Sequence, residues 1–155
     1  MNPDLMRRAI TMAIENVKAG RGGPFAALVA RNDEIIAEGT NIVTSTGDPT
    51  AHAEITAIRN ACQELGDFEL TGCTLYTSCE PCPMCFGAVY WARLDRVYYA
   101  ATHTEAAKVG FDDSHIYEQI DRAPEARTIP MERVLEDESW APFKTWIEYE
   151  DRVDY

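Results

Sequence analysis

The first third of the chain changes from a helical to a strand-like pattern of apolar residues. After Pro3-Asp4, apolar side chains recur every three or four residues, which predicts an amphipathic helix that ends before Gly20. Its expected buried face comprises Met6, Ile10, Ala13, Ile14 and Val17. Residues 25–30 and 35–40 then predict the two strands of a hairpin.

The middle of the chain alternates helices with strands. A helix is expected from Ala51 to Gly66, then a strand at 74–77, a helix at 82–91 and a wholly apolar strand at 97–101. The expected buried stripe of the first of these helices is Ile55, Ile58, Cys62 and Leu65. This order predicts an α/β fold with a mixed sheet, helices on both of its faces, and a last strand buried on both faces.

Beyond Thr102 the pattern weakens. We expect a loop through 111–113, a fifth strand at 128–134 and a helix at 142–148, all within a single domain spanning residues 1–155. The tail, about 139–155, carries five large apolar groups: Trp140, Phe143, Trp146, Ile147 and Tyr149. So many large apolar side chains predict that the tail docks on another surface. A frayed acidic tail is the alternative.

Charge and cysteine content restrict the class of partner. The 155 residues include 14 basic and 26 acidic ones, a net charge of −12, which disfavours nucleic-acid binding and favours a small neutral substrate. Arg7, Arg8 and Glu15 interrupt any signal sequence, and no run approaches the roughly 20 apolar residues that span a membrane. Five cysteines, an odd number, favour the reducing cytoplasm.

Two short motifs carry the candidate chemistry: His52-Ala53-Glu54 and Pro81-Cys82-Pro83-Met84-Cys85. His52, Cys82 and Cys85 are three zinc ligands that leave the fourth tetrahedral position open for water, as catalytic zinc sites do. Glu54 then stands beside that water as a general acid and base. The motifs predict one Zn²⁺ per chain, held where two helix N-termini converge and favour thiolates.

Cys79 opens an alternative reading of the same residues. Cys79, Cys82 and Cys85 form a C-x₂-C-x₂-C run, which could bind an iron–sulfur cluster with Cys62 or Cys73 as the fourth ligand. The cluster would leave His52 and Glu54 unused. A purely structural metal site would likewise have no use for Glu54, which would then be a surface carboxylate.

Several segments together resemble a known family. Residues 50–54, 79–85 and 87–93 resemble the cytidine-deaminase-fold zinc deaminases, and the match is nearest to bacterial guanine deaminases. The metal motifs are shared with cytosine and tRNA-adenosine deaminases, so they indicate the chemistry and not the substrate. Residues 110–113 and Tyr155 are what favour guanine.

The resemblance implies a three-layer α/β/α fold with a mixed five-stranded sheet, a homodimer, and hydrolysis of guanine to xanthine and ammonia. By this resemblance Asp113 is a second catalytic carboxylate that accepts N–H groups of the purine base. Asp112 fits that role equally on spacing alone, and a solvated turn is the bland alternative. The implied substrate-binding residues are Asn41, which hydrogen-bonds the base, Phe25, which packs on it, Ala53, Trp91, Phe111, and Tyr155, which closes the active site of its own or the partner subunit.

Three other functions stay open on the sequence. A guanosine deaminase shares the motifs but needs space for ribose, which a closing Tyr155 restricts. A tRNA adenosine deaminase is opposed by the acidic charge balance. A zinc-bearing interaction module without catalysis has no use for Glu54.

Overall fold

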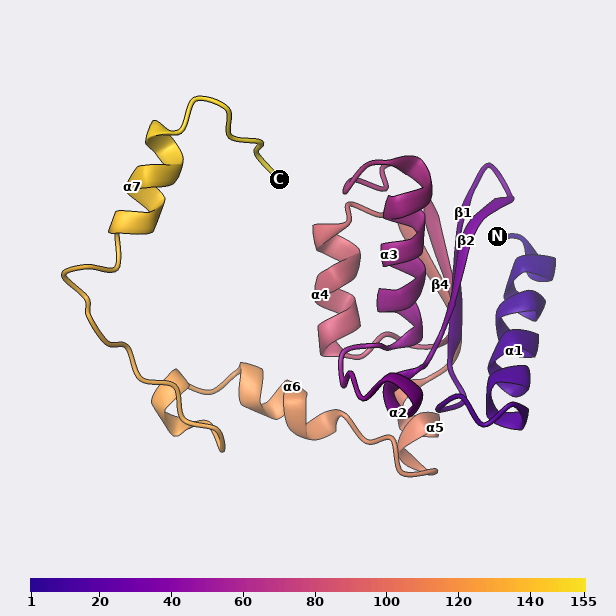
Figure 1. Cartoon of the computed structure of the whole chain (residues 1–155). Helices are drawn as coiled ribbons and strands as arrows, with labels where there is room; N and C mark the ends of the chain where they lie inside the picture. The colour runs from indigo at the N-terminus through magenta and orange to yellow at the C-terminus, as the bar shows by residue number, and fades with distance from the viewer. The chain divides into compact units, whose positions relative to one another are not determined.

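A computed structural model describes residues 1–155, which divide into two units, Met1–Asp113 and Ser114–Tyr155. The first unit is a sheet covered on both faces by helices (Figure 1). Its elements are α1 (Pro3–Lys18), β1 (Ala26–Arg31), β2 (Glu34–Thr40), α2 (Val43–Thr46), α3 (Ala53–Leu65), β3 (Thr74–Cys79), α4 (Pro83–Trp91), β4 (Arg96–Ala101) and α5 (His103–Ala107). The predicted α/β class and the predicted order of elements are confirmed.

The sheet is mixed, as predicted, but has four strands instead of five. The strand order is β2-β1-β3-β4, with β1 antiparallel to β2 and β3, and β3 parallel to β4. Residues 128–134, expected as a fifth strand, form no regular secondary structure. As a result β4 is an edge strand with partly exposed side chains, and the expectation that it is buried on both faces is wrong.

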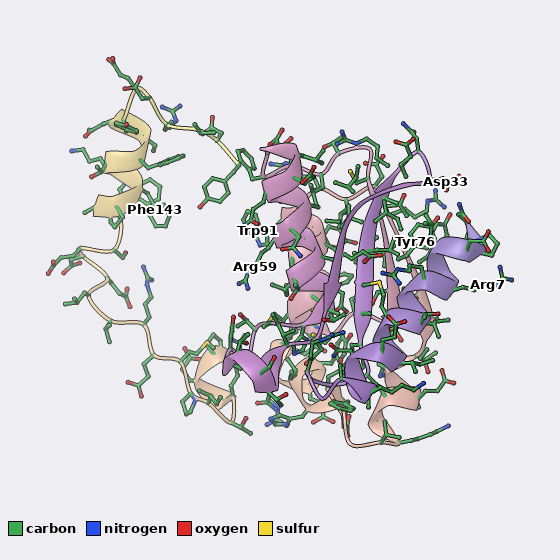
Figure 2. All side chains as sticks on the ribbon, turned by 45° about the vertical axis from the view of Figure 1, so that its right-hand side comes forward. Arg7, Asp33, Arg59, Tyr76, Trp91 and Phe143 are labelled. Carbon is green, nitrogen blue, oxygen red and sulfur yellow. The ribbon has the colours of Figure 1, made fainter.

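Helix α1 covers one face of the sheet through a stripe that shares only Ala13 with the predicted one. Its buried residues are Leu5, Ala9, Met12, Ala13 and Asn16. The small side chains of this stripe let the helix lie close to β1 and β3, where Tyr76 packs with Leu5 and Ala9. In Figure 2, Tyr76 lies between the sheet and α1. The larger Ile10, Ile14 and Val17 are exposed, so size of side chain alone misled the sequence prediction.

Helices α3 and α4 lie side by side on the opposite face (Figure 1). A row of alanines, Ala53, Ala57 and Ala61, faces the sheet, while Ile55, Cys62 and Leu65 of the expected stripe are only half-buried. The approach of α3 to β2 is so close that a Cβ on Gly39 would lie 2.3 Å from the backbone nitrogen of Ala57. This contact fixes the N-terminus of α3, where His52 and Glu54 lie.

The second unit contains α6 (Ser114–Ile120), a 3₁₀ turn η1 (Pro124–Ala126) and α7 (Ala141–Glu148), which confirms the predicted terminal helix. Aromatic pairs form within it: the rings of Trp140 and Phe143 lie 5.3 Å apart, and those of Trp146 and Tyr155 lie 6.4 Å apart. None of its residues is buried in the single chain. In neither unit is there a helix whose length and apolar content would let it cross a bilayer.

Candidate active site

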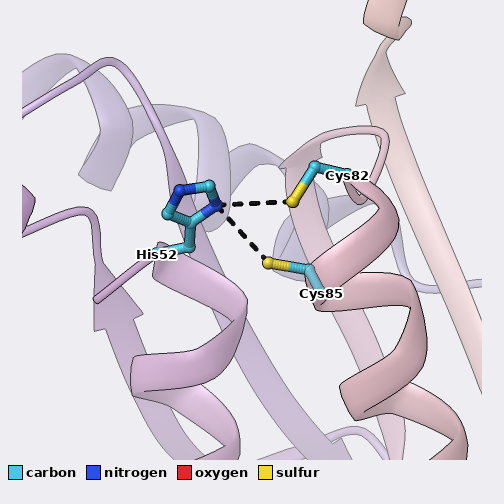
Figure 3. Close-up of side chains that lie close together, drawn as sticks. All are labelled: His52, Cys82 and Cys85. Carbon is cyan, nitrogen blue, oxygen red and sulfur yellow. Dashed lines mark hydrogen bonds between the residues drawn. The ribbon is translucent and has the colours of Figure 1, made fainter. Parts of the chain in front are cut away.

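Three ligand side chains converge at one end of the α3–α4 pair. The Nδ1 atom of His52 lies 3.5 Å from the sulfur of Cys82 and 3.6 Å from that of Cys85 (Figure 3). These three ligand atoms all lie within 4.8 Å of one another, and no fourth His, Cys, Asp or Glu joins the group.

The position of each ligand follows from how the two helices begin. His52 is the N-cap of α3 and Cys82 the N-cap of α4, both with extended backbone and neither using its side chain as a capping group. Pro83 occupies the first turn of α4, where its missing N–H costs no hydrogen bond. Because the helices pack in parallel on one face of the sheet, their N-termini meet with the ligand side chains free.

The electrostatics of the group favour a thiolate. A hydrogen bond from the Cys85 thiol, together with one from His52, lowers the pKa of Cys82 to about 4 despite burial. Because Cys85 is the donor to that thiolate, the pKa of Cys85 is raised, and the contact with Cys82 raises the pKa of His52. The group therefore favours one thiolate, and a cation bound by these residues would favour ionisation of Cys85 as well.

The donor set and its spacing fit zinc. Typical Zn–N and Zn–S bonds of about 2.1 and 2.3 Å at a tetrahedral angle separate the two ligand atoms by about 3.6 Å. Both nitrogen–sulfur distances found here match that value. One imidazole and two sulfurs form a three-ligand set of the kind that catalytic zinc sites use, in which the fourth position takes water.

Glu54 lies beside the ligands in the first turn of α3 and is only 6% exposed. Burial raises the pKa of its carboxyl group to about 7, with a further rise from the Cys82 sulfur. A carboxyl group that titrates near neutral pH can both accept and donate a proton there, which is the property that a general acid and base needs.

Cys79 lies outside the group of three candidate metal ligands, which disfavours the alternative of an iron–sulfur cluster. The Cys79 sulfur lies 3.8 Å from the backbone oxygen of Thr102, and burial raises the pKa of its thiol to about 11. Cys62 and Cys73 lie in or against the apolar core and are likewise outside the group.

A cavity of about 390 Å³ opens beside the ligands. Its size is within the range of pockets that bind small molecules. It is lined by Gly23, Phe25, Asn41, Val43, Thr44, His52, Glu54, Cys79, Glu80, Cys82, His103, Ala106, Gly110, Phe111, Asp112 and Asp113. The cavity thus brings together residues of both sequence motifs and of the loop after α5.

Two aromatic rings form an apolar wall of the cavity. The rings of Phe25 and Phe111 meet edge to face with centroids 4.8 Å apart. Asn41 lies close by, and its side-chain oxygen accepts hydrogen bonds from the backbone N–H groups of Gly23, at 3.3 Å, and Val43, at 3.4 Å. A planar apolar ring with polar edges would find both stacking and hydrogen-bonding groups here.

The two acidic residues of the loop after α5 differ in environment. Asp112 is exposed, whereas Asp113 is half-buried and its Oδ1 atom has no hydrogen-bond partner within the protein. Burial raises the pKa of Asp113, and the nearest basic group is His103, whose Nδ1 lies 3.9 Å from that oxygen. An unsatisfied buried acceptor is suited to an N–H group of a ligand.

Two of the residues expected around the base, Ala53 and Trp91, do not line this cavity. Ala53 is fully buried between His52 and Glu54, and its side chain packs in the core. Trp91 is 70% exposed at the opposite end of α4 from Cys82, labelled in Figure 2, because a helix carries its first and last residues apart. Tyr155 belongs to the second unit.

Sequence reasoning missed three polar residues of the cavity, Thr44, Glu80 and His103. The Glu80 carboxylate accepts a hydrogen bond of 3.0 Å from the backbone N–H of His103 and so joins the end of β3 to the start of α5. The capping box of Thr102 and Glu105 was a readable sign that a helix starts at His103. No sequence signal showed that this helix would face the metal ligands.

Comparisons with known proteins agree with this geometry. Guanine deaminase of Bacillus subtilis is 55% identical over 97% of this chain and 96% of its own. Its crystal structure covers 100% of this chain and 99% of its own, with 54% identity and a TM-score of 0.97. A solved protein in complex with 8-azaguanine is 40% identical over 70% of this chain and 63% of its own, with a TM-score of 0.67.

More distant relatives act on another substrate class. The tRNA-specific adenosine deaminase of Haemophilus influenzae is 37% identical over 70% of this chain and 66% of its own. The family model for the cytidine and deoxycytidylate deaminase zinc-binding region matches residues 2–101, which include all three metal ligands and Glu54. The chain therefore belongs to the cytidine and deoxycytidylate deaminase zinc-binding family.

Proposed function

We propose that this protein catalyses the zinc-dependent hydrolysis of guanine to xanthine and ammonia. The observation that carries the proposal is the group of His52, Cys82, Cys85 and Glu54 beside one cavity. The chain that forms this cavity is 55% identical to a guanine deaminase over nearly its full length. Zinc, when bound by the three ligands, supplies a Lewis acid that makes a water molecule nucleophilic near neutral pH.

The protein's own residues account for the movement of protons. Glu54 takes a proton from the attacking water, delivers it to a ring nitrogen of the base, and then helps to protonate the leaving amine. Its pKa of about 7 suits each of these transfers, because the carboxyl group gains and loses a proton at little cost near neutral pH. The reaction is balanced, because one guanine and one water molecule contain the same atoms as one xanthine and one ammonia molecule.

The lining of the cavity favours guanine over adenine. Guanine offers an N1–H and an exocyclic amine as donors, whereas adenine has no hydrogen on N1. The Asp113 carboxylate, with one oxygen unpaired, accepts such donors, while Phe25 and Phe111 contact the apolar ring. A similar protein in complex with 8-azaguanine supports a purine base as the ligand class.

We propose that residues 1–155 form one domain whose tail completes the site. Residues Ser114–Tyr155 bury no side chain of their own, although Trp140, Phe143 and Trp146 are large and apolar. A segment without a core gains stability only by docking on another surface. We expect Tyr155 to close the active site of the partner subunit.

The homodimer and the compartment are further proposals. Phe86, Tyr90 and Trp91 expose large apolar side chains on α4, and such a patch is typical of a protein–protein interface. Five free cysteines, of which two must stay reduced to bind zinc, favour the cytoplasm.

A tRNA adenosine deaminase is the second candidate, since such enzymes are among the relatives. The net charge of −12 opposes it, because a tRNA ligand needs basic residues that replace its counterions. Guanosine is disfavoured for a different reason: a tail that closes the cavity leaves no room for ribose.

The Glu54→Gln substitution tests the chemical proposal. It removes the proton carrier and leaves the three metal ligands, so we expect about one zinc per chain and a loss of turnover of about 100-fold or more, the usual contribution of general acid–base catalysis. Metal analysis and ammonia release from guanine are the two measurements. Substantial turnover by this variant would refute the role of Glu54. Iron in place of zinc would refute the assignment of zinc as the bound metal.

The Asp113→Asn substitution, with Asp112→Asn as its matched control, tests the second carboxylate. Asn at 113 replaces the unpaired acceptor by an amide, so we expect kcat/KM for guanine to fall by about tenfold or more, the cost of one hydrogen bond to a charged group. Asp112 is exposed, and its variant should stay within about twofold of the original. Equal losses for both variants would contradict the assignment to Asp113.

Deletion of Tyr155 tests the tail. We expect the deletion to reduce guanine turnover much more than thermal stability, because Tyr155 is exposed in the single chain and contributes little to its fold. A hybrid dimer then separates the two arrangements: one chain carries Glu54→Gln and an intact tail, the other an intact Glu54 and no Tyr155. Restored activity means that the tail closes the partner's site, and an inactive hybrid would contradict that arrangement.

A further inference from the structure

Asn16 is a polar residue in the buried stripe of α1, and its side chain is 0% exposed. Its Nδ2 atom donates two hydrogen bonds, one of 2.9 Å to the backbone oxygen of Gly23 and one of 2.8 Å to that of Asn41. Gly23 and Asn41 both line the cavity, whereas Asn16 does not. One buried amide outside the cavity therefore joins two segments that form its wall.

These hydrogen bonds bear on Asn41, the residue proposed to recognise the base. The backbone N–H of Asn41 donates to Phe25 at 3.0 Å, and its backbone oxygen accepts from Asn16. Its Oδ1 atom accepts from the N–H groups of Gly23 and Val43. An amide whose oxygen is held by two N–H donors cannot turn over without breaking both bonds, which leaves its NH₂ group as the end available to a ligand.

Close packing makes this arrangement sensitive to small movements. A Cβ on Gly22 would lie 2.1 Å from the backbone oxygen of Asn41, so the two backbones are already in contact. A Cβ on Gly23 would lie 3.2 Å from the ring of Phe25. A shift of the 22–23 segment would therefore displace Phe25 and the N–H that holds the Asn41 amide.

We propose that Asn16 is a positioning residue that fixes the orientation of the Asn41 amide, so that the site selects a base with a hydrogen-bond acceptor opposite Asn41. The inference rests on the proposed function, because it concerns how a purine base is recognised. Asn16 itself touches neither the base nor the metal ligands, and acts only through Gly23 and Asn41.

Arg21 fixes Asn16 in turn. Its Nε atom donates to the Oδ1 atom of Asn16 at 3.2 Å, and a guanidinium can only donate. The Asn16 oxygen must therefore face Arg21, which turns its NH₂ group toward the two carbonyls. Arg21 is exposed, so the chain of contacts from Arg21 through Asn16 to Asn41 begins at the surface.

A double-mutant cycle tests the proposal on the zinc-loaded protein. We expect Asn16→Ala to lower kcat/KM for guanine by about tenfold, the value of one hydrogen bond, with zinc content unchanged. Asn41→Ala should lose at least as much, and the double variant should lose no more than Asn41→Ala alone. Met12→Ala, in the same buried stripe one turn earlier, is the control, and should reduce stability while changing kcat/KM less than about twofold.

Arg21→Met provides a second variant that leaves the buried stripe of α1 unchanged. It should cause a smaller loss in the same direction, again absent when Asn41 is already alanine. The proposal is overturned if Asn16→Ala loses the same factor in both backgrounds, or if it behaves as Met12→Ala does. A wild-type protein that is inactive on guanine would refute the proposed function instead.

A measurement without substrate decides the inference in every case. The side-chain ¹⁵N–H signals of Asn41 should form one well-dispersed pair in the wild-type protein, because the amide is held in one orientation. In the Arg21→Met and Asn16→Ala variants they should move toward the values of a solvent-exposed amide. Unchanged Asn41 signals in both variants would overturn the proposal.

Discussion

The close packing of α3 and α4 on one face of the sheet is the constraint on which the site depends. Each helix begins with a ligand, His52 before α3 and Cys82 before α4, so the distance between ligands is set by the distance between helices. Helix α3 lies close to the sheet because alanines face the sheet and because Gly39 has no side chain where α3 crosses β2. The metal group is thus a consequence of backbone packing, and its ligands need no loop to close around them.

The same geometry gives the site a polar end that can bind a metal and an apolar wall that can contact a base. The ligand end of the helices is polar and favours thiolates, while the cavity beside it has an apolar wall of Phe25 and Phe111. Glu54 lies at the boundary, buried enough for its carboxyl group to hold a proton near neutral pH. Asn41 is held by backbone groups from two segments, so the hydrogen-bonding end that it presents is determined before any ligand arrives.

The sequence predicted the chemistry better than it predicted the packing. His52, Cys82 and Cys85 could be identified because spacing and residue type together define a zinc site, and the order of helices and strands followed from periodicity. The buried stripe of α1 was predicted wrongly, since Ile10 and Ile14 were preferred to the smaller Ala9 and to Asn16. Periodicity reports an apolar face, but it cannot report which side chains allow close approach, nor that a buried asparagine has two carbonyls as partners.

The position of His103 and the absence of a fifth strand show a second limit of prediction from the sequence. His103 reaches the cavity because β4 leads into α5 beside β3, a long-range arrangement that no local pattern encodes. Residues 128–134 have apolar side chains suited to a strand yet form none, and the local apolar pattern could not show this.

The central claim is that the zinc site and its cavity are adapted to deaminate guanine. It is tested most directly by measuring ammonia release from guanine, guanosine, cytosine and adenine side by side with the zinc-loaded protein. Guanine should be preferred by about 100-fold or more, because adenine has no N1–H for the Asp113 acceptor and guanosine carries a ribose. Equal or faster release from any of the other three would contradict the account.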